Sequence, residues 1–229
     1  MTDPSSGPDP DANPDERPTT SSEISALVDA VQLKDRPRTG WQLRGVSDPE
    51  SVAAHSWGVA YLCLVFGDRM EAEFAADERE LDPNRAVRLA IVHDLAEAET
   101  GDIPTRADST ADTPDPAETD AAEQQAIAEL TGPLPARLRH DWDEYESRQS
   151  PESIFAKEMD LIELCLQALA YESAGRYDPA AGDPDAFHEY DALDEFFATA
   201  KPRLRTELGH ALFDEIRDRY KAARDSDSN

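Results

Sequence analysis

The sequence predicts an all-α protein, on three observations. Apolar residues recur at intervals of three and four along most of the chain, which is the spacing of one helix face. No segment alternates convincingly between apolar and polar residues, so no strand is expected, and no segment repeats. Capping residues precede several apolar stretches, twice with proline in the first turn. The 229 residues suffice for one domain of ordinary size.

The chain begins with a segment that has almost no apolar side chain. Residues 1–19 consist mainly of Pro, Asp, Ser and Thr, so we expect an acidic, disordered tail. The domain is predicted over residues 20–224, and a second disordered tail over 225–229. Thr20 and Glu23 fit a capping box that opens the first helix. Apolar residues follow there at helical spacing: Ile24, Leu27, Val28 and Val31.

The second predicted helix begins near Pro49, after a loop that carries Arg38, Gly40 and Trp41. One broad face of this helix is apolar apart from a single histidine. That face consists of Val52, His55, Val59, Leu62, Cys63 and Phe66.

A third helix is predicted from Asp82 and Pro83, which fit its cap and first turn, to just before Gly101. Its apolar residues are expected to be mostly buried: Val87, Leu89, Ala90, Ile91 and Leu95. Residues 105–121 form a Thr-, Asp- and Pro-rich connection, long enough to be mobile or functional.

The remaining helices include the most apolar one in the chain. Helices are predicted near 117–131 and 134–147, and a long one from Ser150, with Pro151 in its first turn, to about Ser173. The apolar stripe of the long helix is Phe155, Met159, Ile162, Leu166 and Leu169. After a break at 178–184, the last two predicted helices are 185–199 and 202–223.

The charge balance is extreme, because 50 Asp and Glu oppose 22 Lys and Arg, for a formal net charge of −28. Such a field repels nucleic-acid backbones and anionic membranes, so neither is an expected partner. Acidic residues occur along the whole chain, and only four residues are lysines. This distribution favours a halophilic protein, in which salt would screen the repulsion between acidic residues. The alternative is a protein whose charge mainly maintains solubility.

Three absences favour a cytoplasmic protein. No run of eighteen apolar residues suggests a membrane span, and no charged-then-apolar leader suggests secretion. The two cysteines, Cys63 and Cys165, lie among apolar residues in helical patterns. We expect packed, reduced thiols there rather than a disulfide.

Four ionisable residues stand where the helical pattern requires an apolar residue or alanine. They are His55, His93, Asp94 and Asp160, on three different predicted helices. Burying such groups without partners is costly, whereas one shared metal ion would satisfy all of them. Imidazole nitrogen with carboxylate oxygen suits a divalent transition metal such as Mn, Co, Fe, Ni or Zn, and Mg is also open. The alternative is a set of hydrogen-bonded core residues, including an internal His–Asp pair.

These residues lie in segments that form a specific series. The segments are "RTGWQLRGV", "ESVAAHS", "RLAIVHDLAEAETGDIP" and "FAKEMDLIELCLQALAYE". The series resembles the HD-domain superfamily of metal-dependent phosphohydrolases. It is most similar to the branch of 5′-deoxynucleotidases and HD-domain-containing protein 2-like hydrolases. The resemblance covers about residues 24–173 and implies a compact helical domain with a metal site between helices.

The resemblance implies roles for the residues that match its motifs. The implied metal ligands are His55, His93, Asp94 and Asp160. Glu97 would orient or deprotonate the attacking water as general base. Asp102 would lie near the sugar and the reacting phosphate. From the residues alone, Glu97 could equally be a solvated carboxylate like the nearby Glu99, and Asp102 an ordinary turn residue.

The resemblance also implies substrate contacts. Trp41 matches a family tryptophan that approaches the nucleoside, the alternative being a buried core residue. Lys157, together with Arg38 and Arg44 on either side of the tryptophan, would supply positive charge for the phosphate. Bacterial deoxynucleotidases of this branch carry Arg directly before the tryptophan, where this chain has Gly40. Arg38 would replace that arginine from two residues upstream.

The implied activity is hydrolysis of a nucleoside 5′-monophosphate, with preference for deoxynucleotides, to nucleoside and phosphate. A single metal is expected, because the sole histidine between the His-Asp motif and Asp160 is His140, on a helix face predicted to be exposed. The alternatives are hydrolysis of a nucleoside triphosphate, a cyclic nucleotide or a ribonucleotide, or a non-catalytic metal-stabilised binding protein. The family further implies a homodimer.

Overall fold

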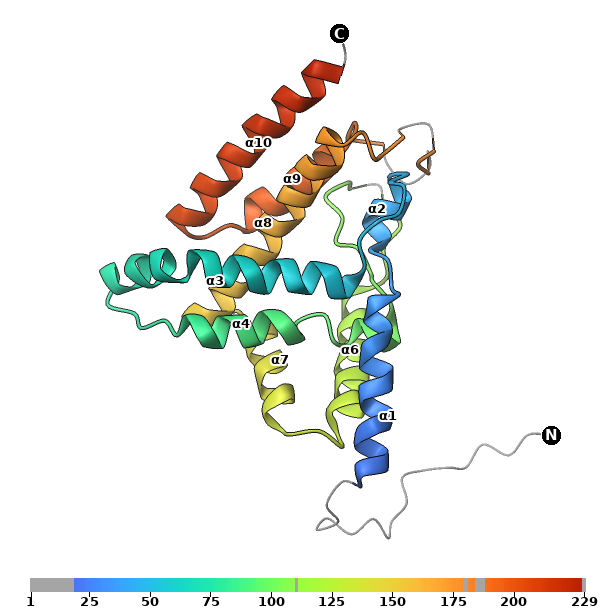
Figure 1. Ribbon diagram of the computed structural model, residues 1–229, viewed down its shortest axis with the longest axis vertical. Coiled ribbons are helices and arrows are strands. Elements are labelled where there is room, and N and C mark those ends of the chain that lie inside the picture. The colour runs from blue at the N-terminus through green and yellow to red at the C-terminus, as the bar shows by residue number, and fades with distance from the viewer. Residues whose placement is uncertain (1–18, 110, 179–180, 184–187, 228–229) are drawn as a thin grey trace, which may run out of the picture.

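The computed structural model describes residues 19–109, 111–178, 181–183 and 188–227 (Figure 1). Within these ranges the protein is all-α, as predicted; two isolated bridges, Pro37–Ser51 and Val46–Tyr177, are its only extended pairings. The predicted tail over residues 1–19 lies outside the described residues except for Thr19, as do the last two residues of the chain.

Ten α-helices and two short 3₁₀ helices make up the described part of the chain. The α-helices are α1 (Thr20–Val31), α2 (Thr39–Leu43), α3 (Val52–Ala76), α4 (Pro83–Val92), α5 (Glu97–Thr100), α6 (Pro116–Thr131), α7 (Arg137–Ser147), α8 (Pro151–Ser173), α9 (Asp194–Ala200) and α10 (Glu207–Asp227). The 3₁₀ helices are η1 (Gln32–Lys34) and η2 (Lys201–Arg203).

The main core lies where α3, α4 and α10 pack against α8 (Figure 1). The predicted stripe of α8 supplies much of it, since Phe155, Met159 and Ile162 are fully buried. Cys63 and Cys165 are buried in the same core as free thiols, as expected. A smaller unit, in which α1 packs on α5 and α6, lies beside this core and is joined to it through α7.

Side-chain caps fix the starts of the helices largely as predicted. Asp82 and Ser150 cap α4 and α8, each with proline in the first turn. The predicted capping residue of the first helix was wrong by one position. Thr19, not Thr20, caps α1, because its hydroxyl accepts the Ser22 amide at 3.2 Å.

Two predictions about the residues around Trp41 and His93 were wrong. The predicted loop around Trp41 contains the short helix α2. The third helix is interrupted, because α4 ends at Val92 and α5 begins at Glu97. Between them the backbone forms i→i+3 hydrogen bonds, from Leu95 N to Val92 O at 3.1 Å and from Glu97 N to Asp94 O at 3.0 Å. Such tight turns are common at helix ends, and helical spacing in the sequence does not distinguish them from a continuous helix.

The C-terminal helices also differ from their predicted bounds. α9 is shorter than the predicted 185–199, of which residues 185–187 lie outside the described part. α10 begins at Glu207 rather than 202, where the Glu73 carboxylate accepts the Glu207 amide at 2.7 Å and the Leu208 amide at 3.0 Å. It continues to Asp227, so residues 225–227 are helical rather than part of a tail.

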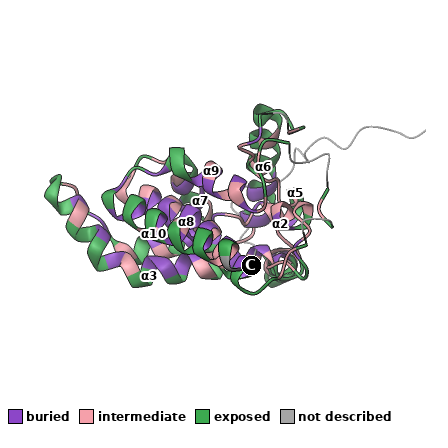
Figure 2. Ribbon diagram, turned by 90° about the horizontal axis from the view of Figure 1, so that it is seen from above, coloured by how far each residue is buried: buried purple, intermediate pink, exposed green. Residues whose placement is uncertain are grey.

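Large apolar side chains remain exposed on three helices. The predicted apolar face of α1 is open to solvent, and Ile91, expected to be buried on α4, is 56% exposed. Figure 2 shows exposed and buried residues alternating along α3. The exposed apolar residues are Ile24, Leu27, Val28, Val31, Trp57, Tyr61, Leu64, Val65 and Ile91. None of the described helices combines the length and apolar character needed to cross a membrane.

Candidate metal centre

The four predicted ligands lie together where α3, α8 and the α4–α5 turn meet. One nitrogen each of His55 and His93 and one oxygen of Asp160 all lie within 4.8 Å of one another. Asp94 Oδ2 lies 3.0 Å from His93 Nε2 and 3.8 Å from His55 Nε2. The structure therefore contains a possible metal site of two imidazoles and two carboxylates, a donor set that suits a divalent transition metal.

The histidine hydrogen bonds fit a metal. His93 Nδ1 lies 2.8 Å from the Ala90 carbonyl, to which it must donate, so its Nε2 carries a free lone pair. That Nε2 is buried, and although Asp94 Oδ2 lies 3.0 Å away, none of its contacts has the geometry of a hydrogen bond. Buried polar atoms are rarely left unpaired, and a metal ion would satisfy this one.

His55 is oriented by a residue that the sequence did not single out. Its Nδ1 lies 2.5 Å from Glu163 Oε2, while its Nε2 faces Asp160 at 3.0 Å. Gly58, on the neighbouring turn of α3, makes room for this carboxylate, because a Cβ at that position would lie 2.8 Å from Glu163 Oε1. Glu163 follows Asp160 by three residues in an apolar helix, and this second ionisable residue on the same face was a signal available in the sequence.

Asp160 is held by two further contacts besides His55. Tyr145, from α7, donates its hydroxyl to Asp160 Oδ2 at 2.8 Å, and Lys157 Nζ lies 2.5 Å from the same oxygen. Burial would raise the pKa of Asp160, but Lys157 and the two histidines hold it well below its ordinary value. Asp160 therefore stays anionic, as a metal ligand must. Tyr145 lies in an acidic helix whose pattern gave no indication of this role.

Arg38 joins the carboxylates around the centre from the start of α2. Its NH1 lies 3.1 Å from Asp94 Oδ2, 3.0 Å from Asp102 Oδ1 and 3.8 Å from Glu97 Oε1. Burial opposes the charge of Arg38, but the surrounding carboxylates, Asp102 first, raise its pKa. One permanent cation thus faces the three acids.

Glu97 and Asp102 occupy the two ends of α5. Glu97 begins the helix, and its Oε2 is buried without a hydrogen-bond partner. Burial, and then the charge of Asp94, raises the pKa of Glu97 well above its ordinary value. Gly101 ends the helix at a φ of 78°, which favours glycine, and Asp102 then accepts the Thr39 amide at 2.5 Å. Glu99, in contrast, is exposed.

Two cavities are lined in part by residues of the candidate metal centre. The Trp41 cavity, about 130 Å³, is lined by Trp41, Phe196, Asp94, Glu97, Asp102 and Lys157, among others. The Glu123 cavity, about 410 Å³, is lined by Glu123, Tyr145, His93, Asp94, Glu97 and Lys157, among others. Asp94, Glu97 and Lys157 belong to both, so the candidate metal centre lies between them.

Trp41 meets both interpretations proposed for it. It is 1% exposed and belongs to the main core, yet it lines the Trp41 cavity. Its ring centroid lies 3.9 Å from that of Phe196, and its Nε1 donates to Glu50 Oε1 at 3.0 Å. Burial and the nearby Glu163 raise the pKa of Glu50 to about 7.

Arg44 is not brought to the centre with the other predicted residues. Its NH2 donates to the Tyr190 carbonyl at 2.8 Å and lies 3.8 Å from Glu195 Oε2. It lines neither cavity, because α2 carries Arg38 and Arg44 at opposite ends and directs them to different partners. His140 is exposed on α7, as expected.

Comparison with known proteins gives a consistent result. The family model described as "HD domain" matches residues 30–201. The 5′-deoxynucleotidase HDDC2 of Homo sapiens is 39% identical over 163 residues, covering 66% of this chain and 72% of the human protein. The 5′-deoxynucleotidase hdd1 of Schizosaccharomyces pombe is 31% identical over 161 residues, covering 66% of this chain and 74% of its own.

A solved structure has a similar fold. A Pyrococcus horikoshii protein of known crystal structure superposes with a TM-score of 0.61 at 30% identity, covering 86% of this chain and 98% of its own. The family model alone spans well over half of the chain. The chain therefore belongs to the HD domain family.

Proposed function

We propose that this protein is a metal-dependent phosphohydrolase that cleaves deoxynucleoside 5′-monophosphates to nucleoside and phosphate. The observation that carries the proposal is the meeting of His55, His93 and Asp160 beside Glu97, whose buried Oε2 has no hydrogen-bond partner. The names of the human and yeast relatives, both 5′-deoxynucleotidases, support the substrate class.

One divalent transition metal would be held by His55, His93, Asp94 and Asp160. When bound, it lowers the pKa of water and offsets phosphate charge. Mn, Co, Fe, Ni and Zn all suit these donors, and Mg is compatible with the carboxylates. Glu163 and Tyr145 are positioning residues, because they hold His55 and Asp160 from the side away from the shared centre.

Glu97 is the proposed general base. Its Oε2 has no other partner, so it is free to accept a proton from the attacking water. Burial and the charge of Asp94 raise the pKa of this carboxylate, which makes it a stronger base than an exposed glutamate.

Cations near the centre are the proposed contacts to the phosphate, and aromatic residues of the Trp41 cavity are the proposed contacts to the nucleoside. Arg38 and Lys157 face the centre and would neutralise phosphate oxygens, with Asp102 holding Arg38 in place. Trp41 and Phe196 would contact the nucleoside from the Trp41 cavity. We leave Arg44 out of this set, because its guanidinium is directed to Tyr190 and Glu195.

The test is a panel of phosphate esters assayed with each candidate metal. We expect deoxynucleoside 5′-monophosphates to be cleaved fastest, with ribonucleotides slower. Faster cleavage of triphosphates or cyclic nucleotides would assign another phosphoester to the same centre. No turnover with any metal, together with tight metal binding, would identify a metal-stabilised binding protein instead.

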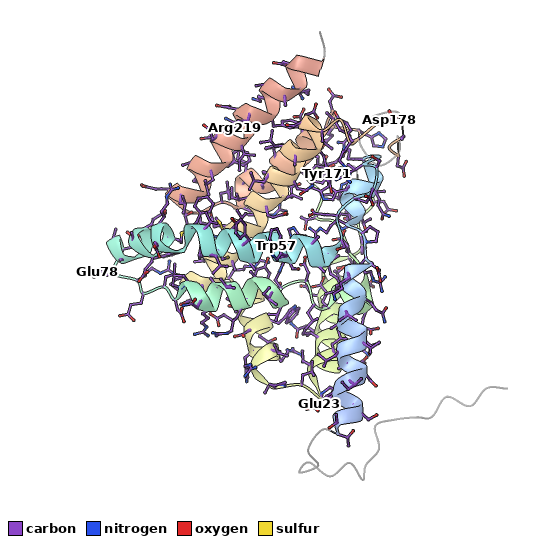
Figure 3. All side chains as sticks on the ribbon, viewed as in Figure 1. Glu23, Trp57, Glu78, Tyr171, Asp178 and Arg219 are labelled. Atoms are coloured by element: carbon purple, nitrogen blue, oxygen red, sulfur yellow. The ribbon has the colours of Figure 1, made fainter. Side chains whose placement is uncertain are left out.

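We also propose that the protein is a homodimer that uses the exposed apolar residues of α3 and α4. Trp57 and Tyr61 stack on the outer surface of α3 with ring centroids 5.4 Å apart, and Leu64 and Val65 continue the same surface (Figure 3 labels Trp57). Contiguous exposed apolar surface of this kind is typical of protein–protein contacts.

The acidic composition supports a cytoplasmic, halophilic protein without nucleic-acid or membrane partners. At about 1 M salt the Debye length falls to about 3 Å, which screens most surface repulsion. We therefore expect the melting temperature to rise between low and molar NaCl, given the net charge of −28. A melting temperature that does not change with salt would contradict the halophilic interpretation.

A further inference from the structure

A third cavity, the arginine cavity, lies next to the candidate metal centre and has a volume of about 340 Å³. Its lining residues are Arg148, Ile154, Lys157, Glu158, Pro202, Arg203 and Arg205. Four of these seven residues are cations, in a chain with 22 basic against 50 acidic residues. The arginine cavity therefore has the opposite charge to the protein as a whole.

The single acid of the arginine cavity does not neutralise the arginine side chains. The Glu158 carboxylate is buried and accepts the Arg205 backbone amide and, at 2.9 Å, the Thr206 hydroxyl. Burial raises the pKa of Glu158 above its ordinary value. Its oxygens therefore anchor the start of α10 rather than a guanidinium.

The guanidinium groups of Arg203 and Arg205 instead donate to backbone carbonyls. Arg203 donates to Thr199 O, and Arg205 NH1 donates to Arg148 O at 3.3 Å. Neither forms an ion pair with a carboxylate of the described residues, in a protein where most arginines do so. At the wall of one cavity, two positive charges thus have no ion pair with a carboxylate of the described residues, and Asp160 acts on Arg203 only from a longer range.

The third arginine is held at the arginine cavity by an unusual backbone conformation. Arg148 ends α7 at a φ of 53°, in the left-handed region, where glycine or asparagine is usual. Its Nε donates to the Tyr145 carbonyl at 3.0 Å, and its one ion pair, to Glu146, is long at 3.8 Å. Burial, and then the charge of Arg148, lowers the pKa of Arg203, so these two cations are close enough to repel each other.

An anion between the arginines would remove this repulsion and satisfy their free donors. Lys157 lines this cavity and both cavities at the metal centre, and Arg203 also lines the Trp41 cavity. We propose that Arg148, Arg203 and Arg205 form a phosphate-binding subsite separate from the centre where the ester is cleaved. The phosphate group would be either free inorganic phosphate or a distal phosphate of a nucleoside triphosphate.

Isothermal titration calorimetry with inorganic phosphate, at fixed NaCl and with metal bound, tests the subsite directly. We expect R203Q/R205Q to weaken phosphate binding at this subsite by at least about tenfold, because charge-assisted hydrogen bonds are lost. The matched control is R69Q/R137Q, which removes two positive charges from exposed positions on α3 and α7 and should bind phosphate like the parent. Unchanged binding of both inorganic phosphate and a nucleoside triphosphate by R203Q/R205Q, or an equal loss in the control, would overturn the proposal.

One further double variant, R203K/R205K, separates the effect of charge from an effect on folding. R203K/R205K keeps both charges and should retain phosphate binding within a few-fold, whereas its failure to rescue the loss seen in R203Q/R205Q would count against the proposal. Circular dichroism should give the same melting temperature for all variants, because both replaced side chains are exposed. A lower melting temperature of R203Q/R205Q alone, with phosphate binding intact in its folded fraction, would overturn the proposal.

Repeating the titration with deoxyadenosine 5′-triphosphate in an E97Q background distinguishes free inorganic phosphate from a distal phosphate of a nucleoside triphosphate. Weaker binding of inorganic phosphate on R203Q/R205Q assigns the subsite to free phosphate, and weaker binding of the triphosphate alone assigns it to a distal phosphate. If neither ligand is affected, the proposal fails. The titration measures the heat of binding and not hydrolysis. Absence of ester hydrolysis would therefore count against the proposed function and not against the phosphate-binding subsite.

Discussion

The two faces of α3 depart from the usual burial pattern in opposite directions. The inner face buries an ionisable residue, His55, at 0% exposure, whereas the outer face exposes Trp57 at 67%. Each departure is energetically unfavourable unless a partner compensates for it. The partners of His55 lie within the chain: its ring nitrogens contact Asp160 and Glu163. His55 also meets His93 and Asp160 at a possible metal site.

For the outer face the described residues provide no comparable partner. The stacked pair of Trp57 and Tyr61 adjoins Leu64 and Val65, all at least half exposed. Polar residues on the inner face of a helix and apolar residues on its outer face therefore indicate different kinds of site. The first indicates chemistry, and the second indicates an association with another surface.

The largest effect is expected at Glu97, which begins α5 beside the possible metal site. We expect Glu97→Gln to lower kcat by about a hundred- to ten-thousand-fold while metal content stays unchanged, because the proposed base is lost and the ligands remain. The matched control is Glu99→Gln, which removes the same charge from an exposed position on the same helix. Near-normal turnover by Glu97→Gln, or equal loss in both variants, would show that the inner face is not organised around this base.

A smaller effect is expected at Glu163, which supports His55 from behind. Glu163→Gln keeps the shape but weakens the contact that orients the imidazole, so metal affinity should fall by about ten- to a hundred-fold. Competition with a chelator of known affinity measures this, and the melting temperature of the metal-loaded protein checks the fold. Unaltered metal affinity would mean that Glu163 is only a core acid.

The outer face is tested by Trp57→Glu, which puts a charge in the centre of the proposed dimer contact. Large aromatic anchors often contribute most of an interface energy, so we expect the dimer dissociation constant to rise at least about tenfold by analytical ultracentrifugation. Leu27→Glu applies the same change to the exposed face of α1 and shows whether that face belongs to the contact. A parent protein that is monomeric at all concentrations would refute the dimer.

The smallest expected effect concerns Glu123, a partly buried carboxyl group outside the ligand set. Burial, and then the charges of Glu146 and Asp120, raises its pKa to about 7. The neutral form is favoured in the folded state, so its stabilising effect is present at low pH and is lost as pH rises through about 7. Glu123→Gln should therefore be more stable than the parent at pH 8 by on the order of 1 kcal/mol, after allowance for solvent screening, and nearly equal at pH 5.

Melting temperatures across this pH range measure the difference. Glu118→Gln, at an exposed position on the same helix, should show no comparable pH dependence. A Glu123→Gln variant whose stability relative to the parent is constant from pH 5 to 8 would contradict the raised pKa.

The sequence predicted those parts of the molecule in which local pattern and tertiary packing agree. The stripe of α8 and the caps at Asp82 and Ser150 follow from spacing and capping chemistry alone. The convergence of His55, His93 and Asp160 was predictable because each violates its helix's apolar pattern. Their proposed roles still depend on the experiments above.

Other features depend on contacts between segments far apart in the chain. The i→i+3 turn at His93–Ala96 keeps the residue spacing of a helix, so the pattern does not reveal the break. The direction of Arg44 is set by Tyr190 and Glu195, which follow it by more than a hundred residues. Apolar spacing predicted α1 but not its exposure, since spacing indicates a face and not the partner that covers it.

The close approach of Gly58 to Glu163 has a consequence for sequence variation among relatives. Any side chain at position 58 would meet the carboxylate, since even a Cβ would lie 2.8 Å from Glu163 Oε1 and 2.9 Å from its Cγ. The two positions are therefore expected to covary: relatives with glutamate at the position of Glu163 should keep glycine opposite it. A relative with a larger residue there should carry a shorter one on α8 and should orient its histidine by another partner.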